Sequence, residues 1–163
     1  SPSQAHQLFP DAQICVDHNQ ENNDFEKALL LCKDLGVLSI LVVGFNGGLL
    51  EHTLNNWSVL CKYQSNFNLC LYDHQRYAIP IKESILFSFK FGEIVSFIPQ
   101  PYSTLSLKGF EWPLEKEILE LGNREGARNK ANESDCSIDI IEGSVLMFID
   151  ERLPYKPNFS LVY

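Results

Sequence analysis

A glycine-rich turn followed by acidic, imidazole and amide side chains occupies residues 44–56, with the sequence GFNGGLLEHTLNN. Gly47 and Gly48 let the backbone turn sharply and lie close to a ligand. Glu51 and His52 follow at the expected start of a helix. A strand, a glycine-rich turn and a helix N-terminus together form a place where substrates bind in open α/β sheets. The stretch therefore predicts a ligand site, although of a generic kind.

The elements around this turn are predicted from their apolar patterns. The run 37–43 (VLSILVV) is rich in β-branched residues and does not alternate, so we expect a buried strand of a parallel sheet. Residues 51–60 predict a helix with one apolar face: Leu54, Trp57, and Leu60 or Cys61. Residues 12–17 and 66–72 predict two further strands. Alternating strands and helices with short connections predict a parallel α/β sheet.

Residues 24–33 predict a helix before the central strand. Its apolar residues share one face at spacings of three and four: Phe25, Ala28, Leu29 and Cys32. Asn23 or Asp24 can cap this helix, and a negative charge there suits the helix dipole. Asp24 also follows a predicted strand, so its carboxylate has a second interpretation as part of a metal or phosphate site.

The pattern changes after residue 76, where short apolar segments are separated by turn residues. We expect strands in an antiparallel β module, a sandwich or part-barrel, at 77–81, 84–89, 94–99, 104–110, 137–141 and 145–149. Gly143-Ser144 predicts a hairpin turn. Residues 115–130 predict a long polar connection, helical at first. A short helix carrying Ala5, Leu8 and Phe9 is expected near the start, and an extended tail over 159–163.

Composition excludes several classes of protein. The 163 residues are 45% hydrophobic and carry a net charge of −8, so a nucleic-acid partner is not expected, whereas acidic residues suit a metal–nucleotide ligand. No apolar run approaches the roughly 20 residues that span a membrane. No signal peptide is visible, and the five cysteines show no CxxC pair. We therefore expect a cytoplasmic protein with reduced thiols, most of them buried. The sequence does not begin with methionine, so we also expect a chain cut from something longer or a processed form.

Five segments in a fixed order carry a resemblance to a known family. They are NQENNDFEKAL (19–29), GGLLEHTLNN (47–56), VSFIP (95–99), GFEWPL (109–114) and GARN (126–129). In this order they resemble the thiamine pyrophosphokinase (thiamine diphosphokinase) family. The resemblance implies a Rossmann-like parallel α/β domain followed by an antiparallel β-sandwich, in a homodimer with active sites between subunits. It also implies transfer of pyrophosphate from ATP to thiamine, with Mg²⁺, giving thiamine diphosphate and AMP.

The resemblance assigns roles to residues that match the motifs. It implies catalytic roles for Asp24, which would also hold the metal, and Glu51. Residues implied on the nucleotide and substrate side are Gln20, Lys27, Gly47, Gly48 and His52. Residues implied at thiamine are Trp112, Arg128 and Asn129. Structural alternatives remain open: an exposed helical lysine for Lys27, a core tryptophan for Trp112 and a loop cap for Asn129, while Trp57 is expected in the core.

The departures from the family pattern raise an alternative function. Leu49 stands where the family has arginine, Glu51 where it has aspartate, and Arg128 where it has serine. The family's N-terminal strand and acidic G-D-x-D-S motif are not among the 163 residues, so residues 1–75 correspond to the C-terminal part of the catalytic domain and 76–163 to the thiamine-binding domain. The alternatives are an inactive relative that binds ligands or acts as a scaffold, and a two-part nucleotide-binding domain.

Overall fold

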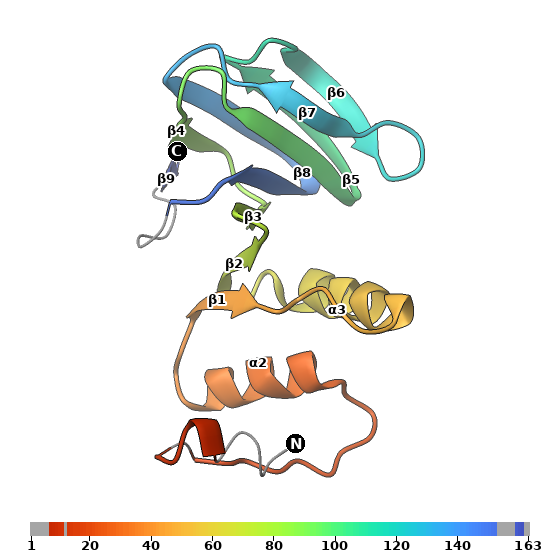
Figure 1. The fold of residues 1–163 in the computed structure, drawn as a ribbon. Helices are drawn as coiled ribbons and strands as arrows, with labels where there is room; N and C mark the ends of the chain where they lie inside the picture. Colours follow the sequence, from red (N-terminus) through yellow and green to blue (C-terminus); the bar gives the residue numbers. More distant parts are fainter. Residues whose placement is uncertain (1–6, 12, 153–158, 162–163) are drawn as a thin grey trace.

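The fold of the chain is seen in a computed structural model, which describes residues 7–11, 13–152 and 159–161. Two helices and β1 lie at one end of the molecule, and the long strands lie at the other (Figure 1). The elements run in the order α2 (Asp24–Asp34), β1 (Ser39–Val43), α3 (Leu50–Tyr63), β2 (Asn68–Asp73), β3 (Arg76–Ile81), β4 (Ile85–Ser88), β5 (Ile94–Lys108), β6 (Leu114–Glu120), β7 (Gly126–Lys130), β8 (Asp135–Asp150) and β9 (Phe159–Leu161).

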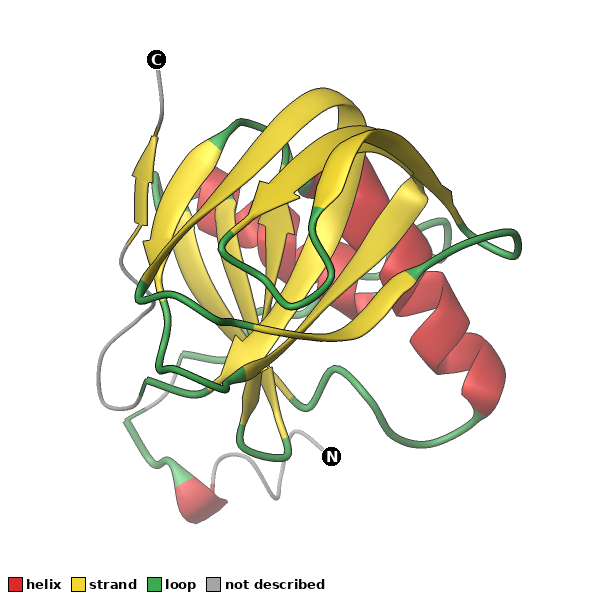
Figure 2. Ribbon diagram, turned by 90° about the horizontal axis from the view of Figure 1, so that it is seen from above, coloured by secondary structure: helices red, strands yellow, loops and turns green. Residues whose placement is uncertain are grey.

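The strands of the described residues form one hydrogen-bonded sheet rather than two. Its order is β1-β2-β3-β8-β4-β9, and β5 pairs with β8, β6 and β7. β1 and β2 run parallel, and the remaining pairs are antiparallel. Seen from above, the strands curve around one another while the helices lie behind them (Figure 2). The fold therefore combines an α/β part with a β-rich part, as expected, and its parallel portion is a single pair of strands.

Two hydrophobic cores lie on opposite faces of the strands that both parts share. Tyr77, Ile79 and Met147 face the core of the β-rich part. Ala78 and Leu146, their neighbours along β3 and β8, face the core beneath the helices. Because successive side chains of a strand point to opposite faces, β3 and β8 supply both cores at once.

Helix α2 is capped by Asn23, whose side-chain oxygen accepts a hydrogen bond from the Glu26 amide at 2.8 Å. Asp24 is therefore the first helical residue and not the cap. In α3 the inward side chains are Val59 and Leu60, with Trp57 partly buried. Leu54, predicted on the apolar face, is exposed, and so that part of the prediction is wrong.

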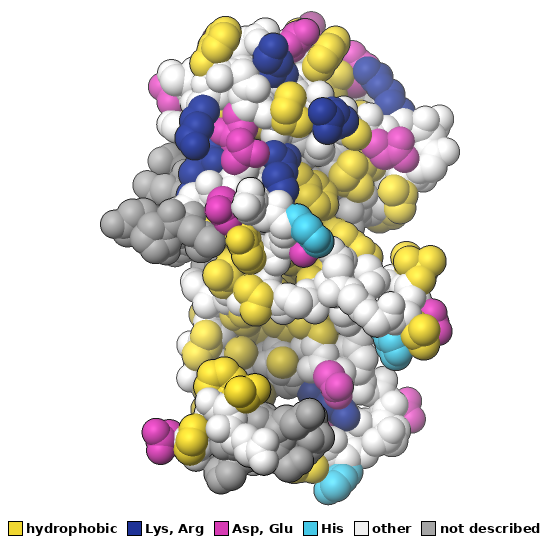
Figure 3. All heavy atoms as spheres, in the orientation of Figure 1, with side chains coloured by type: hydrophobic (Ala, Val, Ile, Leu, Met, Phe, Trp, Pro, Cys, Tyr) yellow, Lys and Arg dark blue, Asp and Glu magenta, His cyan; other side chains and the backbone are white. Residues whose placement is uncertain are grey.

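The run 37–43 forms a strand with a parallel partner, as predicted, but the expectation that this strand is buried is wrong. β1 lies at the edge of the sheet and pairs with β2 alone among the described strands. Val42 is buried under the helices, whereas Leu41 and Val43 on the opposite face are 49% and 66% exposed. Hydrophobic side chains accordingly gather on the surface at the level of β1 and α2 (Figure 3). The strand is apolar on both faces, but the described residues cover one of them.

Two predictions fail because long strands replace short ones. Residues 115–130 contain β6, a turn and β7, since β6 and β7 both find backbone partners on β5. The segments expected at 94–99 and 104–110 belong to β5, and those expected at 137–141 and 145–149 belong to β8. Gly143 is thus not in a hairpin turn. It lies within β8 with a positive φ of 76°, opposite Ser103, where the pairing shifts register.

The chain ends are described in part. Residues 13–17 form no strand, and Ile14 and Val16 are exposed there, which corrects the expected first strand over 12–17. Gln7 and Leu8 are helical, whereas Ala5 lies outside the described residues. Within the expected tail, Phe159–Leu161 forms β9 against β4. None of the helices in the described residues has the length and apolar character needed to cross a membrane.

A buried carboxylate joins α2 to α3. Glu26 is 6% exposed, and its Oε1 accepts hydrogen bonds from Lys62 Nζ at 2.6 Å and from the Tyr63 hydroxyl at 2.7 Å. The hydrogen bond from Lys62, followed by that from Tyr63, lowers the pKa of Glu26 below its ordinary value of 4.5. The ionised form is therefore the one that the folded protein stabilises.

The lowered pKa of Glu26 makes the stability of the folded protein depend on pH. A carboxyl group whose pKa is lowered by folding stabilises the protein above its unfolded pKa, and this contribution is lost as pH falls through the folded pKa. We expect Glu26→Gln to cost about 1–3 kcal/mol at pH 7, and the difference from wild type to shrink below pH 4.5. Urea unfolding of both proteins at several pH values measures this. Glu115→Gln, at an exposed position of β6, is the control.

Candidate functional site

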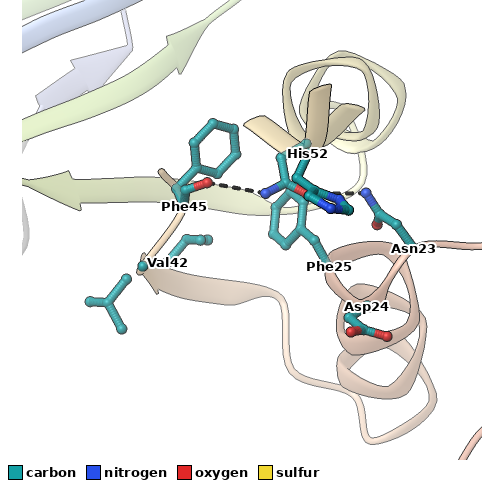
Figure 4. A pocket seen from close by; sticks show the side chains of 9 residues that line it. Asn23, Asp24, Phe25, Val42, Phe45 and His52 are labelled. Carbon is teal, nitrogen blue, oxygen red and sulfur yellow. Dashed lines mark hydrogen bonds between the residues drawn. The ribbon is translucent and has the colours of Figure 1, made fainter. Parts of the chain in front are cut away.

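A cavity of about 590 Å³ opens where β1 ends, between the N-terminal turns of α2 and α3 (Figure 4). It is lined by Asn23, Asp24, Phe25, Val42, Val43, Gly44, Phe45, His52 and Asn56. The cavity thus lies beside the glycine-rich turn that the sequence indicates. Asn23, Asp24 and Phe25 at the start of α2 and two residues from the first two turns of α3 line it. The partial positive charge at a helix N-terminus favours an anionic ligand.

Asparagine side chains hold the wall of this cavity. Asn56 Nδ2 donates to the Phe45 carbonyl at 3.1 Å, and Asn23 Nδ2 donates to Asn56 Oδ1 at 3.0 Å. The Phe45 ring is buried and lies edge-on to Phe25 and Trp57, with ring centroids 5.6 and 4.9 Å away. Asn23 and Asn56 are within segments that the motifs cover, but nothing in their spacing singles them out. The packed Trp57 agrees with its predicted core role.

Two of the predicted site residues line the cavity: Asp24, predicted for catalysis and the metal, and His52, predicted on the nucleotide and substrate side. Both are exposed, and Asp24 is at the first turn of α2 with its carboxylate in solvent. The His52 ring lies near Gly48, since a Cβ placed on that glycine would be 4.0 Å from His52 Cδ2. One carboxyl side chain and one imidazole thus line the cavity.

Lys27 and Gln20 do not line the cavity. Lys27 Nζ donates to the Asp17 carbonyl at 3.2 Å and lies 4.0 Å from Asp24 Oδ1, and its side chain is 17% exposed. It is therefore not a freely exposed helical lysine; it ties the preceding loop to α2. Gln20 is exposed and donates to the His18 carbonyl.

The glycine-rich turn has the backbone shape that its sequence indicates. Gly47 and Gly48 have φ values of 136° and 70°, where side chains are rarely tolerated. Glu51 is in the first turn of α3 and exposed, and it does not line the cavity. Leu49, at the helix cap position, makes no side-chain capping hydrogen bond.

A second hollow, of about 670 Å³, lies on the β-rich part. It is lined by Arg76, Gly92, Glu93, Ile94, Ser96, Ile98, Arg128, Phe148 and Asp150. Arg76 pairs with Asp150 at 2.5 Å, and the buried Glu93 pairs with Arg152 at 2.7 Å. Arg128 forms no ion pair with the described residues, and its amide donates to Ser96 Oγ at 2.9 Å. Within the described residues, Arg128 is thus the cationic side chain of this hollow that forms no ion pair.

Trp112 and Asn129 lie together but outside this hollow. Asn129 is buried; its Oδ1 accepts from the Trp112 amide at 3.1 Å and its Nδ2 donates to the Trp112 carbonyl at 2.8 Å. Trp112 itself is 56% exposed, so it is not a core tryptophan. The two hydrogen bonds from Asn129 therefore fix the backbone of Trp112, whose indole ring is exposed.

No group of three or more histidine, cysteine, aspartate or glutamate side chains converges within the described residues. A magnesium ion often keeps several waters and takes one or two protein carboxylates together with phosphate oxygens. Asp24 fits the role of one such carboxylate, but these residues alone do not form a full site.

The five cysteines are free. Cys70 and Cys136 are buried, and burial raises the pKa of their thiols to about 12 and about 11. Cys15 and Cys61 are exposed, so the prediction that most of the thiols are buried is wrong. High pKa values leave the buried thiols protonated at neutral pH.

Comparison with known protein families gives two matches in succession. Residues 4–71 match the sequence model described as "Thiamin pyrophosphokinase, catalytic domain", and residues 77–144 match "Thiamin pyrophosphokinase, vitamin B1 binding domain". The two matches together span most of the chain. A direct comparison with curated protein sequences gives no match.

Solved structures share the fold. Thiamine pyrophosphokinase from Bacillus subtilis has a TM-score of 0.76 at 22% identity, covering 93% of this chain and 73% of its own. Thiamin pyrophosphokinase from Geobacillus thermodenitrificans has a TM-score of 0.75 at 22% identity, and the match covers 93% of this chain and 71% of that protein. A probable thiamine pyrophosphokinase from Staphylococcus saprophyticus has a TM-score of 0.63 at 25% identity, covering 93% and 72%.

Proposed function

Since the chain belongs to the thiamin pyrophosphokinase family, we propose that it transfers pyrophosphate from ATP to thiamine, giving thiamine diphosphate and AMP. The observation that carries this proposal is the cavity at the end of β1, which lies beside the glycine-rich turn and is lined by residues from the N-terminal turns of α2 and α3. The thiamine hydroxyl oxygen would bond to the β-phosphorus of ATP while the bond from that phosphorus to the bridging oxygen of AMP breaks. Such chemistry needs mainly positioning and charge neutralisation.

On the nucleotide side, phosphates would lie over Gly47 and Gly48, with His52 at the mouth of the cavity. Asp24 would hold Mg²⁺, which when bound would neutralise charge on the phosphate oxygens. Glu51 is exposed one residue before His52 and would reach the ligand from outside the cavity. Gln20 and Lys27 have backbone partners within the preceding loop, and we propose that they order that loop beside the substrate.

On the thiamine side, the exposed indole of Trp112 would stack on the cationic thiazolium ring. Asn129 would fix the position of that indole through the Trp112 backbone. Arg128 would contribute to the second hollow. We propose residues 76–163 as the thiamine-binding domain, with a sandwich-like packing of its curved sheet, and residues 1–75 as the remaining part of the catalytic domain.

The acidic G-D-x-D-S segment of the family would come from polypeptide outside these 163 residues. The open edge of β1 supports this proposal, because its backbone can pair with a further strand. The exposed side chains of Leu41 and Val43 leave a sheet face that further polypeptide could cover. A homodimer with sites between subunits would also bring residues from a second copy. We also propose that the protein is cytoplasmic.

The test is product formation by the full-length gene product, with residues 1–163 in parallel. Mg-ATP and thiamine are supplied, thiamine diphosphate and AMP are quantified by chromatography, and each ligand is titrated by calorimetry. The proposal expects equimolar products from the full-length protein. Ligand binding without product would instead support the inactive relative, which Leu49 and Glu51 motivate and which the family matches do not favour.

Removing the indole tests the thiamine side. We expect Trp112→Ala to raise the KM for thiamine about tenfold, in line with the loss of roughly 1–2 kcal/mol of cation–π contact, and to change the KM for ATP much less. Initial rates with each substrate varied in turn measure both constants. Phe91→Ala removes another exposed aromatic ring of the β-rich part and is the control. Equal increases in both constants would argue against stacking.

A further inference from the structure

The glycine-rich turn is anchored to the rest of the molecule at two points. One anchor is Phe45, whose ring is buried and whose carbonyl accepts from Asn56. The other is the next residue, Asn46, whose Nδ2 donates to Asp73 Oδ2 at 2.7 Å. The second anchor crosses from the turn after β1 to the end of β2, where the two parallel strands finish side by side.

The carboxylate of Asp73 is itself held in place. Its other oxygen, Oδ1, lies 2.8 Å from His74 Nδ1. Asp73 pairs with Arg76 across a two-residue hairpin, in which His74 and Gln75 take left-handed φ values of 46° and 62°. Contact with His74, and then with Asn46, lowers the pKa of Asp73, so the group is ionised at neutral pH. A tight hairpin thus presents a fixed anion to a turn that contains flexible glycines.

We propose that Asp73 is a positioning residue for the Gly44–Gly48 turn, acting through Asn46. This inference rests on the proposed function, because the turn is there the wall that receives the phosphates of ATP. Gly44, Gly47 and Gly48 all have positive φ, and their freedom must be limited if the backbone is to meet a ligand in one shape. Phe45 fixes the base of the turn, and the Asp73–Asn46 contact fixes the side nearer the glycine pair.

A role in positioning differs from a role in stability. The Asp73 side chain is 45% exposed and belongs to neither hydrophobic core. Its removal should therefore leave the fold intact and release the turn. The structure brings the two residues together although 27 positions separate them in the sequence.

A double-mutant cycle tests the proposal in the full-length protein. We expect Asn46→Ala and Asp73→Ala each to raise the KM for Mg-ATP about tenfold, as for the loss of a hydrogen bond to a charged group. The double variant should be no worse than either single variant, and the KM for thiamine should change less than about twofold. Asp73→Asn keeps an acceptor oxygen, so its KM for Mg-ATP should lie between the values of wild type and Asp73→Ala. Asp135→Ala is the matched control, since it removes a carboxylate that accepts from Ser88 in the β-rich part.

Amide hydrogen exchange of residues 44–48 supplies a readout that does not need turnover. Faster exchange there in Asp73→Ala, with exchange in β5 and β8 unchanged, supports the proposal. Additive losses in the cycle, or equal changes in both KM values, would overturn it. If wild type makes product and Asp73→Ala has an unchanged KM for Mg-ATP, this inference fails and the proposed function stands. If wild type binds no Mg-ATP, the proposed function fails, and unchanged exchange in Asp73→Ala would also overturn the anchoring role.

Discussion

Replacing Asp24 by asparagine is expected to lower the rate of thiamine diphosphate formation by on the order of 100-fold or more while the protein stays folded. The carboxylate is fully exposed at the first turn of α2 and lines the cavity at the end of β1. Asparagine keeps the shape but loses the charge that would hold a cation. The helix keeps its cap, because Asn23 and not Asp24 accepts the hydrogen bond from the Glu26 amide.

The measurement is kcat with Mg-ATP and thiamine, together with circular dichroism and thermal unfolding. Loss of a negative charge at a helix N-terminus should cost less than about 1 kcal/mol of stability. Glu21→Gln removes an exposed acidic residue outside the cavity and should leave kcat near that of wild type. An unfolded Asp24→Asn protein, or one with full activity, would contradict the assigned role.

The largest effect on stability is expected at Gly143. A Cβ added there would lie 2.2 Å from the Tyr102 carbonyl oxygen and 3.0 Å from Ser103 Cα. Both are backbone atoms of β5, so no side-chain rotation relieves the overlap. The φ of 76° adds a further penalty for any residue with a Cβ. We expect Gly143→Ala to reduce the free energy of unfolding by about 3 kcal/mol or more.

The variant Gly122→Ala separates the cost of backbone strain from the cost of steric overlap. Gly122 has a φ of 84°, yet a Cβ there would meet no atom within 4 Å. This variant should lose about 1–2 kcal/mol from backbone strain alone. Urea unfolding of both variants gives the difference, which reports the steric overlap between β8 and β5. Equal losses in the two variants would mean that the strands move apart without cost.

The sequence predicted those elements whose signals are local. The apolar spacing and the cap of α2 predict that helix. The apolar run 37–43, which ends in a glycine, predicts β1 and the turn before α3, and the separate segment 66–72 predicts β2. Residues 115–130 were misread because Glu, Lys and Arg are common there and suggest a solvated helix. In the structure these side chains line β6 and β7, which β5 organises through backbone hydrogen bonds. Pairing between distant strands leaves little trace in local composition.

The candidate site was predictable to a similar extent. Asp24, Gly47, Gly48 and His52 belong to short motifs. Asp24 and His52 line the cavity at the end of β1, whereas Gly47 and Gly48 lie in the turn beside it and do not line it. The Asn46–Asp73 contact was not predictable, since neither residue has a helical or strand-like spacing relative to the other. The position of Trp112 also depends on a distant partner, because the Asn129 side chain hydrogen-bonds both backbone polar groups of Trp112.

The shared strands β3 and β8 have a consequence for how the two halves can be separated. A boundary at the hairpin after β2 divides the sequence, but the hydrophobic interior continues across it. A fragment beginning there would leave Ala78, Leu146 and Phe148 without the helical layer that they pack against. Each half therefore supplies side chains to the hydrophobic core of the other half. We expect the two halves to unfold together in a single cooperative transition.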